Sequence, residues 1–284
     1  MIKLGIIGYP LGHTLSPVMH KAALDYLGIE GDYAVLETPP EELINRIKYL
    51  KVQGFRGFNV TIPLKVWIVP LLNEVDEYAN LAGAVNTVII SENKDLYGYN
   101  TDIDGFIESI PEDLKENLKS KKAAILGAGG AARAVAIGLS TIGINEITFY
   151  ARNPEKANII QDVILEGFPE IKVKIKEFNE FADLSYASIV VNTTPIGMQG
   201  INEGISPINK KTVEGLAENT IVYDLIYKPR ETKLIQYAKE HGLYTLDGLE
   251  MLILQGAKAL SLWIDQEAPV EVMREAVLKS LKSE

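Results

Sequence analysis

The stretch at residues 122–133, KAAILGAGGAAR, restricts the fold of this chain more than any other part of it. Its apolar residues 123–126 predict a short buried strand, and the glycines that follow let the chain turn tightly with no Cβ in the way. Apolar residues then recur at helical spacing over 131–140, so the free N–H groups of a helix start would face the turn. This strand–turn–helix unit is suited to binding a pyrophosphate, although a purely structural turn is the alternative.

A second predicted strand, at residues 146–150, ends where dinucleotide-binding domains carry the residue that contacts the adenine ribose. The residues that follow it are Ala151, Arg152 and Asn153, none of which is acidic. An acid at this place accepts hydrogen bonds from the ribose of NAD and repels the 2′-phosphate of NADP, whereas a guanidinium pairs with that phosphate. Arg152, with Lys156 four residues further on, therefore favours NADP, and a solvated pair at a helix start is the alternative.

Strands alternate with helices along most of the chain, a pattern typical of mainly parallel sheets. Before the glycine turn, strands are predicted at residues 4–7, 33–36 and 55–60 and in a short pair near 83–102; after it they are predicted near 173–175, 188–192, 220–224 and 243–246. We therefore expect an α/β protein with a mainly parallel α/β domain over residues 1–103 and a doubly wound, Rossmann-type nucleotide-binding domain over 104–265. An amphipathic helix within 266–284 is expected to return to the first domain.

Composition excludes several classes of protein and of site. With 284 residues, 47% of them hydrophobic, the chain can fill two domains of ordinary size. Its 38 acidic and 28 basic residues give a formal charge of −10, which argues against binding to nucleic-acid backbones. The lack of cysteine excludes disulfides, thiolate zinc sites and cysteine nucleophiles. The histidines, His13, His20 and His241, show no metal-ligand spacing, so we expect no metal.

The N-terminal residues predict where the protein works. They run straight into a predicted strand, without the basic region, long apolar core and cleavage site of a signal peptide. No run of the sequence approaches the roughly 18 apolar residues of a membrane span. We expect a cytoplasmic protein with no membrane partner.

Polar residues at the carboxyl ends of the predicted strands are candidates for ligand contacts, because ligands of parallel sheets gather there. Lys65 follows the third strand, and a lone lysine is ordinarily a solvated charge. A dehydrogenase that reduces a ketone, however, needs a proton donor for the alkoxide formed as hydride arrives, and a lysine–carboxylate pair can serve. Asp102 is the candidate partner, with the N-cap of a helix near 103–110 as its alternative role.

Further hydroxyl and amide side chains could bind a polyhydroxylated ligand, although each alone is more typical of a turn or a cap. They are Thr14, Ser16, Asn59, Thr61, Asn86 and Gln255.

Motifs spread over nearly the whole chain resemble those of shikimate dehydrogenases. They are HTLSP at 13–17, NVTIPLK at 59–65, LAGAVNT at 81–87, YNTDIDG at 99–105, GAGGAARA at 127–134, NTTPIGM at 192–198, DLIYKP at 224–229 and DGLEMLILQGA at 247–257. Several of them are specific to that family, unlike the glycine turn. The resemblance implies an NADP-dependent oxidoreductase acting on a CH–OH group, which reversibly reduces 3-dehydroshikimate to shikimate in the aromatic amino acid pathway to chorismate. It also implies a homodimer and no metal.

Carried over position by position, the resemblance implies roles for particular residues. Lys65 would be the proton donor and acceptor, and Asp102 would hold it and bind substrate hydroxyls. The other substrate contacts would be Thr14, Ser16, Asn59, Thr61, Asn86, Tyr227 and Gln255. The cofactor contacts would be Glu77, Gly127, Ala128, Gly129, Gly130, Ala131, Ala151, Arg152, Asn153, Lys156, Thr193, Leu225 and Gly248.

Thr14 departs from the family pattern, which usually has serine at this place, and it adds a methyl group beside the carboxylate pocket. This keeps open a quinate/shikimate dehydrogenase with relaxed substrate or NAD use, because quinate has one more ring hydroxyl. From another class, a nucleotide-binding sensor without catalysis is the alternative. The presence of both Lys65 and Asp102 argues against it.

Overall fold

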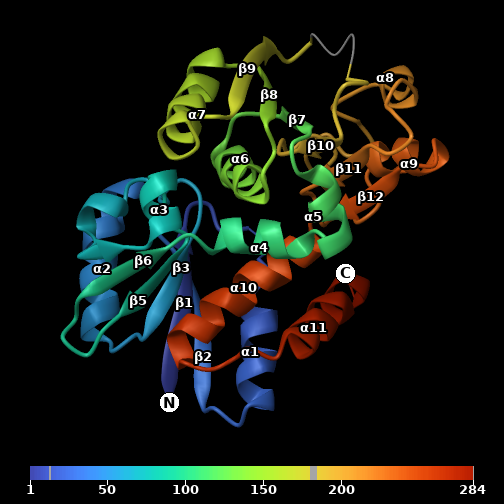
Figure 1. Ribbon diagram of the computed structural model, residues 1–284. Helices are drawn as coiled ribbons and strands as arrows, with labels where there is room; N and C mark the ends of the chain where they lie inside the picture. Colours follow the sequence, from blue (N-terminus) through green and yellow to red (C-terminus); the bar gives the residue numbers. More distant parts are fainter. Residues whose placement is uncertain (13, 180–183, 284) are drawn as a thin grey trace. The chain divides into compact units, whose positions relative to one another are not determined.

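The computed structural model describes residues 1–12, 14–179 and 184–283, and it divides the chain into two domains (Figure 1). The first domain comprises Met1–Gly105 and Ile253–Glu284, and the second comprises Phe106–Leu252. His13, in the motif HTLSP, lies outside the described residues. No helix in the described ranges has the length and the apolar character that a membrane crossing requires.

The first domain is built on a six-stranded sheet with the order β2-β1-β3-β5-β6-β4. Strand β1 pairs in parallel with both of its neighbours, whereas β5 runs antiparallel to β3 and to β6. Only residues 91–95 connect β5 to β6, and a connection this short can join only antiparallel strands. The strands are β1 Ile2–Gly8, β2 Gly31–Glu37, β3 Gly57–Val60, β4 Glu74–Val75, β5 Thr87–Ile90 and β6 Leu96–Tyr99.

Helices complete the first domain. They are α1 Ser16–Tyr26, α2 Leu43–Val52, α3 Glu77–Ala82 and α11 Val270–Ser283, with the 3₁₀ turns Pro40–Glu42 and Val69–Leu71. Helix α1 has Pro17 in its first turn, where the missing N–H of proline costs no hydrogen bond. The hydrophobic core includes Ile7, Phe58 and Val60 from the adjacent strands β1 and β3, all of which are buried. Because these two strands are parallel, the segments after them emerge at the same edge of the sheet.

The second domain has a fully parallel sheet in the order β12-β11-β10-β7-β8-β9. This is the doubly wound order of dinucleotide-binding domains, so the predicted fold class is confirmed. Its strands are β7 Lys122–Leu126, β8 Glu146–Ala151, β9 Lys172–Glu177, β10 Ile189–Asn192, β11 Ile221–Asp224 and β12 Tyr244–Asp247. Its helices are α5 Glu112–Leu118, α6 Gly130–Ile142, α7 Pro154–Gly167, α8 Lys210–Glu214 and α9 Lys233–Glu240.

Two helices, α4 Thr101–Ser109 and α10 Leu249–Ile264, run across the division between the domains. From Ile253 onward α10 belongs to the first domain, although the sequence placed residues up to 265 with the nucleotide-binding domain. The reason is packing: the indole N–H of Trp263 donates to the carbonyl of Val88 over 2.9 Å. A Cβ at Gly57 would collide with that indole nitrogen, so the close approach requires a glycine.

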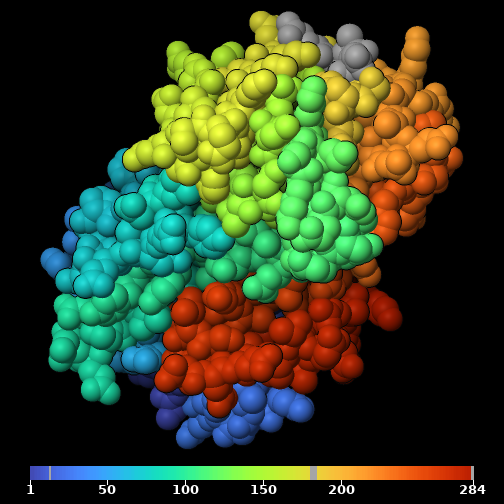
Figure 2. Space-filling view, viewed as in Figure 1, coloured from blue at the N-terminus to red at the C-terminus, as the bar shows by residue number. Residues whose placement is uncertain are grey.

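The last helix, α11, packs against α1 at the beginning of the chain. In Figure 2 the C-terminal segment, in red, lies beside the N-terminal segment, in blue. The two ends of the sequence therefore contribute to one domain, and the second domain is inserted between them.

Candidate active site

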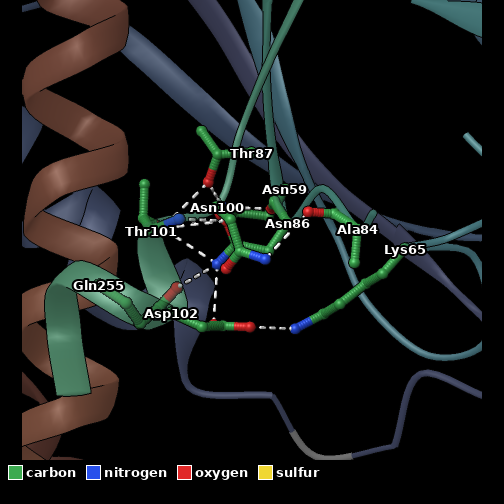
Figure 3. A network of polar contacts seen from close by, with 9 residues as sticks. All are labelled: Asn59, Lys65, Ala84, Asn86, Thr87, Asn100, Thr101, Asp102 and Gln255. Carbon is green, nitrogen blue, oxygen red and sulfur yellow. Dashed lines mark hydrogen bonds and ion pairs between the residues drawn. The ribbon is translucent and has the colours of Figure 1, made fainter. Parts of the chain in front are cut away.

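A lysine–carboxylate pair occupies the edge of the first sheet. The Nζ of Lys65 lies 2.5 Å from Oδ2 of Asp102 (Figure 3). The side chains are 25% and 17% exposed, so the pair is shielded and still reachable from solvent. A charge-assisted hydrogen bond of this kind fixes the ammonium group in direction while leaving it further protons to donate.

Local packing explains why Lys65 points to this place. Leu64 and Ile68 on either side of it are buried in the core, which fixes the turn that carries all three residues. The backbone carbonyl of Lys65 also accepts a hydrogen bond from Val85 N over 2.8 Å. The backbone that carries the lysine side chain is therefore held on both sides.

Asn86 organises the carboxylate from the opposite side. Its Oδ1 accepts from Thr101 N over 2.8 Å, and its Nδ2 donates to Asp102 Oδ1 over 2.8 Å. Nδ2 also lies 3.0 Å from Thr101 Oγ1 and 3.4 Å from Oε1 of Gln255, the predicted substrate residue in α10. Asn86, which is distant in sequence, thus accepts from the first N–H of α4. Asp102 lies inside the first turn of that helix, and its two oxygens accept hydrogen bonds from Lys65 and Asn86. The alternative of Asp102 as an N-cap is therefore wrong.

Asn59 lies deeper than the pair and is only 6% exposed. Its Nδ2 donates to the backbone carbonyl of Asn86 over 3.2 Å and to Thr87 Oγ1 over 3.0 Å, while its Oδ1 accepts from the hydroxyl of Tyr33 over 2.6 Å. Both amide hydrogens therefore have protein acceptors. The predicted contact of Asn59 with a substrate stays a prediction, and in the structure Asn59 supports Asn86.

The other predicted substrate residues fall into two groups. Thr14 and Ser16 follow β1 and Thr61 follows β3, so all three emerge at the edge that carries Lys65. The Ser16 N–H donates to Thr14 Oγ1 over 3.3 Å, which holds that loop in a turn. Tyr227 follows β11 in the second domain, and its substrate contact stays a prediction.

A cavity of about 450 Å³ lies at the carboxyl edge of the second sheet. It gathers eight of the predicted cofactor residues: Gly127, Ala128, Gly129, Ala151, Arg152, Asn153, Lys156 and Thr193. Among the described residues, the remaining predicted cofactor contacts lie outside its lining: Glu77, Gly130, Ala131, Leu225 and Gly248. Glu77 begins α3 of the first domain, and its role stays a prediction.

Three residues that line this cavity were missed by the sequence analysis. Thr194 and Pro195 stand in the same motif as Thr193, so the motif itself was a sufficient signal. Phe178 follows β9 and belongs to no motif, so only the fold brings it to the cavity.

The glycine turn leaves room for a ligand. Gly127 has φ +110°, and a Cβ there would lie 2.7 Å from Thr193 Oγ1, so this glycine is required by the protein itself. At Gly129 and Gly130, in contrast, a Cβ would meet no described heavy atom within 4 Å. The start of α6 therefore opens into free space beside the cationic Arg152 and Lys156. These residues fit the phosphates of a dinucleotide.

Asp224 supports, through Asn192, the loop that carries the cavity residue Thr194. This buried carboxylate accepts hydrogen bonds from Asn192 Nδ2 over 2.9 Å and from Thr232 Oγ1 over 2.6 Å. Asn192 Oδ1 in turn accepts from the N–H and the hydroxyl of Thr194. Burial raises the pKa of Asp224 to about 6, against the lowering effect of these hydrogen bonds.

In the part of the chain that the structure describes, no three His, Asp or Glu side chains form a group able to hold a metal ion.

Comparison with known proteins relates this geometry to a family. Residues 6–88 match the family model of the shikimate dehydrogenase substrate binding domain, and residues 248–278 match that of the shikimate 5′-dehydrogenase C-terminal domain. The NADP⁺-dependent shikimate dehydrogenase of Synechocystis sp. is 43% identical over 98% of this chain and 96% of its own length.

Solved structures agree in fold over almost the whole chain. Shikimate 5-dehydrogenase from Thermus thermophilus, in complex with NADP(H) and shikimate, has a TM-score of 0.83 at 35% identity and covers 99% of this chain and 100% of that one. Quinate dehydrogenase from Corynebacterium glutamicum, in complex with NAD, has a TM-score of 0.90 at 32% identity and covers 98% and 99%. The fold alone therefore does not separate the two substrates, but the full-length sequence identity confirms the resemblance seen in the motifs. The chain belongs to the shikimate dehydrogenase family.

Proposed function

We propose that this chain catalyses the reversible NADPH-dependent reduction of 3-dehydroshikimate to shikimate. The observation that carries the proposal is the Lys65–Asp102 pair, held at 2.5 Å by a network of buried amides and hydroxyls in the domain that matches the substrate-binding family model. The reaction needs a proton donor beside a ketone oxygen, and Lys65 has the chemistry and the accessibility for that task.

Bound NADPH supplies the hydride that forms the new C–H bond at the ketone carbon. As the carbonyl π bond breaks, Lys65 donates a proton from Nζ to the oxygen, which becomes the hydroxyl of shikimate. Asp102 holds the ammonium group in direction throughout. In the reverse reaction the neutral amine of Lys65 removes the hydroxyl proton.

The remaining substrate shell orients the ring. Hydroxyl groups of Thr14 and Ser16 donate to the substrate carboxylate, while Thr61, Asn86 and Gln255 bind the ring hydroxyls. The extra methyl of Thr14 disfavours quinate, although a pocket rejects an added hydroxyl only by about 10² when nothing pairs with it. The first domain thus binds the substrate and the second binds the cofactor.

Arg152 and Lys156 bind the 2′-phosphate of NADP. Both side chains are exposed at the edge of the cavity, where a planar guanidinium can form two parallel hydrogen bonds to phosphate. Asn153 Oδ1 accepts from Lys156 N over 3.2 Å, which fixes the start of α7 beside this pair. A homodimer that works in the cytoplasm is part of the same proposal.

The test is the formation of reduced nicotinamide, followed by absorbance, with each cofactor paired with each substrate. We expect the highest kcat/KM for NADP⁺ with shikimate. Comparable values for quinate would identify a quinate/shikimate dehydrogenase instead. Binding of NADP⁺ by calorimetry without turnover of any pair would favour the nucleotide-binding sensor.

A further inference from the structure

We propose that Tyr33 is a positioning residue for this reaction, which sets the direction of Asp102 and Lys65 through Asn59 and Asn86. The inference rests on the proposed function. Tyr33 lies in β2 and is 5% exposed. Its hydroxyl donates to Asn59 Oδ1 over 2.6 Å.

The hydroxyl of Tyr33 supplies the donor that the amide oxygen of Asn59 needs. An asparagine side chain can rotate by half a turn and exchange its oxygen with its nitrogen at little steric cost. The carbonyl of Asn86 can only accept, so Nδ2 of Asn59 lies on that side, beside the hydroxyl of Thr87. Oδ1 then faces the hydroxyl of Tyr33, and without that hydroxyl it would be buried with no donor. Burial raises the pKa of Tyr33, so this hydroxyl keeps its proton and remains a donor. A single amide orientation satisfies all three contacts.

The orientation of Asn59 reaches the catalytic pair in two further steps. Asn59 holds the backbone carbonyl of Asn86 and the hydroxyl of Thr87, and Thr87 Oγ1 lies 3.2 Å from Thr101 Oγ1. The Asn86 side chain then binds Thr101 N and Asp102 Oδ1. These groups form the network around Asp102 in Figure 3. Each link in this series is buried or half-buried, so water can replace a lost partner only at a cost.

The ring of Tyr33 is held independently of its hydroxyl. It stacks on His20 with ring centroids 4.5 Å apart and planes 11° from parallel, and the ring of Trp263 lies 6.3 Å away. Removing the hydroxyl therefore leaves the packing of the ring in place. The Tyr33→Phe variant separates the role in positioning from the role in the core.

The second domain offers a matched control in Tyr223. This residue is also buried, its hydroxyl lies 2.7 Å from Ser109 Oγ, and its ring stacks on Phe106 at 5.4 Å and 14°. Tyr223→Phe removes an equivalent hydroxyl hydrogen bond far from the network of Asn59 along the chain. Both variants should lose similar thermal stability.

The experiment measures kcat and both KM values for shikimate oxidation. Tyr33→Phe should lower kcat by about tenfold and leave the KM for NADP⁺ within about twofold, because misdirection of a catalytic group costs rate more than cofactor binding. Tyr223→Phe should change neither by more than about twofold. If Tyr33→Phe fails to fold, Thr87→Val removes the next hydroxyl of the series and should show the same loss of kcat.

A second background shows whether Tyr33 acts through Asp102. In the Asp102→Asn protein, Tyr33→Phe should reduce kcat by less than about twofold, since residues of one network are not additive. An equal effect in both backgrounds, or a kcat of Tyr33→Phe within about twofold of wild type, contradicts the positioning role. Either result leaves the proposed function intact. Lack of any wild-type turnover contradicts the proposed function and the positioning role with it.

Discussion

The two candidate binding regions differ in which groups set their geometry, side chains in one and backbone in the other. In the first domain the geometry is set by side chains: a series of hydrogen bonds runs from Tyr33 through Asn59 and Asn86 and ends on Asp102 and Lys65. In the second domain the backbone sets it, because the glycine turn and the start of α6 present bare N–H groups to open space. Side-chain networks and backbone turns therefore fail in different ways. A network is broken by removing one polar atom, whereas a turn is broken by adding one methyl group.

The largest expected effect is in the side-chain region. Lys65→Ala should reduce kcat by about 10²–10⁴, the usual contribution of a general acid–base group, with the KM for NADP⁺ little changed. Steady-state kinetics with shikimate measures both values. Lys21→Ala is the control, since Lys21 forms an exposed pair with Asp25 at 3.2 Å, and such pairs contribute little. Retention of more than about a third of the turnover in Lys65→Ala would remove this lysine from the mechanism.

The next prediction concerns pH, which should change the stability of the two domains in opposite directions. Burial lowers the pKa of His20 in the first domain to about 3 from 6.5. Below pH 6.5 His20 binds a proton in the unfolded state but stays neutral in the folded state. The stability present above that pH is therefore lost as the pH falls toward 3. The loss by pH 4 is roughly 3 kcal/mol at 1.36 kcal/mol per unit.

Asp224 in the second domain has the opposite sign. Its folded pKa is raised from 3.8 to about 6, so the stability it contributes is present below 3.8 and lost as the pH rises through 6. The chain has two tryptophans, Trp67 and Trp263, and both lie in the first domain. The free energy of unfolding of the first domain, measured by urea titration and tryptophan fluorescence, should therefore fall between pH 7 and 4. His20→Phe should remove most of that fall. An equally steep pH dependence in His20→Phe would show that His20 is not its source.

Two glycine substitutions test the backbone region. Gly127→Ala places a Cβ 2.7 Å from Thr193 Oγ1 at φ +110°, so it should cost about 1–3 kcal/mol of stability as well as cofactor binding. Gly129 has φ −93° and free space around its Cβ position, so Gly129→Ala should fold normally and lose only NADP⁺ affinity. Thermal unfolding without ligand and calorimetric NADP⁺ titration distinguish the two. Normal NADP⁺ affinity in Gly129→Ala would place the pyrophosphate elsewhere.

A comparable effect, limited to cofactor affinity, is expected from Arg152, one of the two cationic side chains at the cavity. Arg152→Ala should weaken NADPH by about 10–100-fold, because a charge-assisted hydrogen bond contributes roughly 1.5–3 kcal/mol and 1.4 kcal/mol is a factor of ten. NADH binding should stay nearly unchanged. Lys172→Ala, an exposed lysine at the start of β9, controls for the loss of one positive charge in the same domain. Equal weakening of NADPH and NADH would mean that Arg152 does not bind the 2′-phosphate.

The sequence predicted those parts of the molecule that short-range physics determines. The glycine turn was recognisable because the strand, the turn and the helix start are adjacent in the chain, and cationic residues at the end of β8 were visible for the same reason. The sequence identified Lys65 and Asp102 as candidates. It did not predict that Asn86 binds the first N–H of α4, because that contact depends on the pairing between β5 and β6. Likewise, the apolar face of α10 predicted a helix but not the domain that covers it. Tyr33 had no signal, because its partner Asn59 belongs to another strand.

The inserted arrangement of the second domain has a mechanical consequence. The chain enters that domain through α4 and leaves it through α10, so both connections are continuous helices rather than loops. Asp102 stands just before the first crossing and Gln255 just after the second, and Asn86 is bonded to both. Both helical connections to the inserted domain are therefore anchored, on their first-domain side, to the single side chain of Asn86.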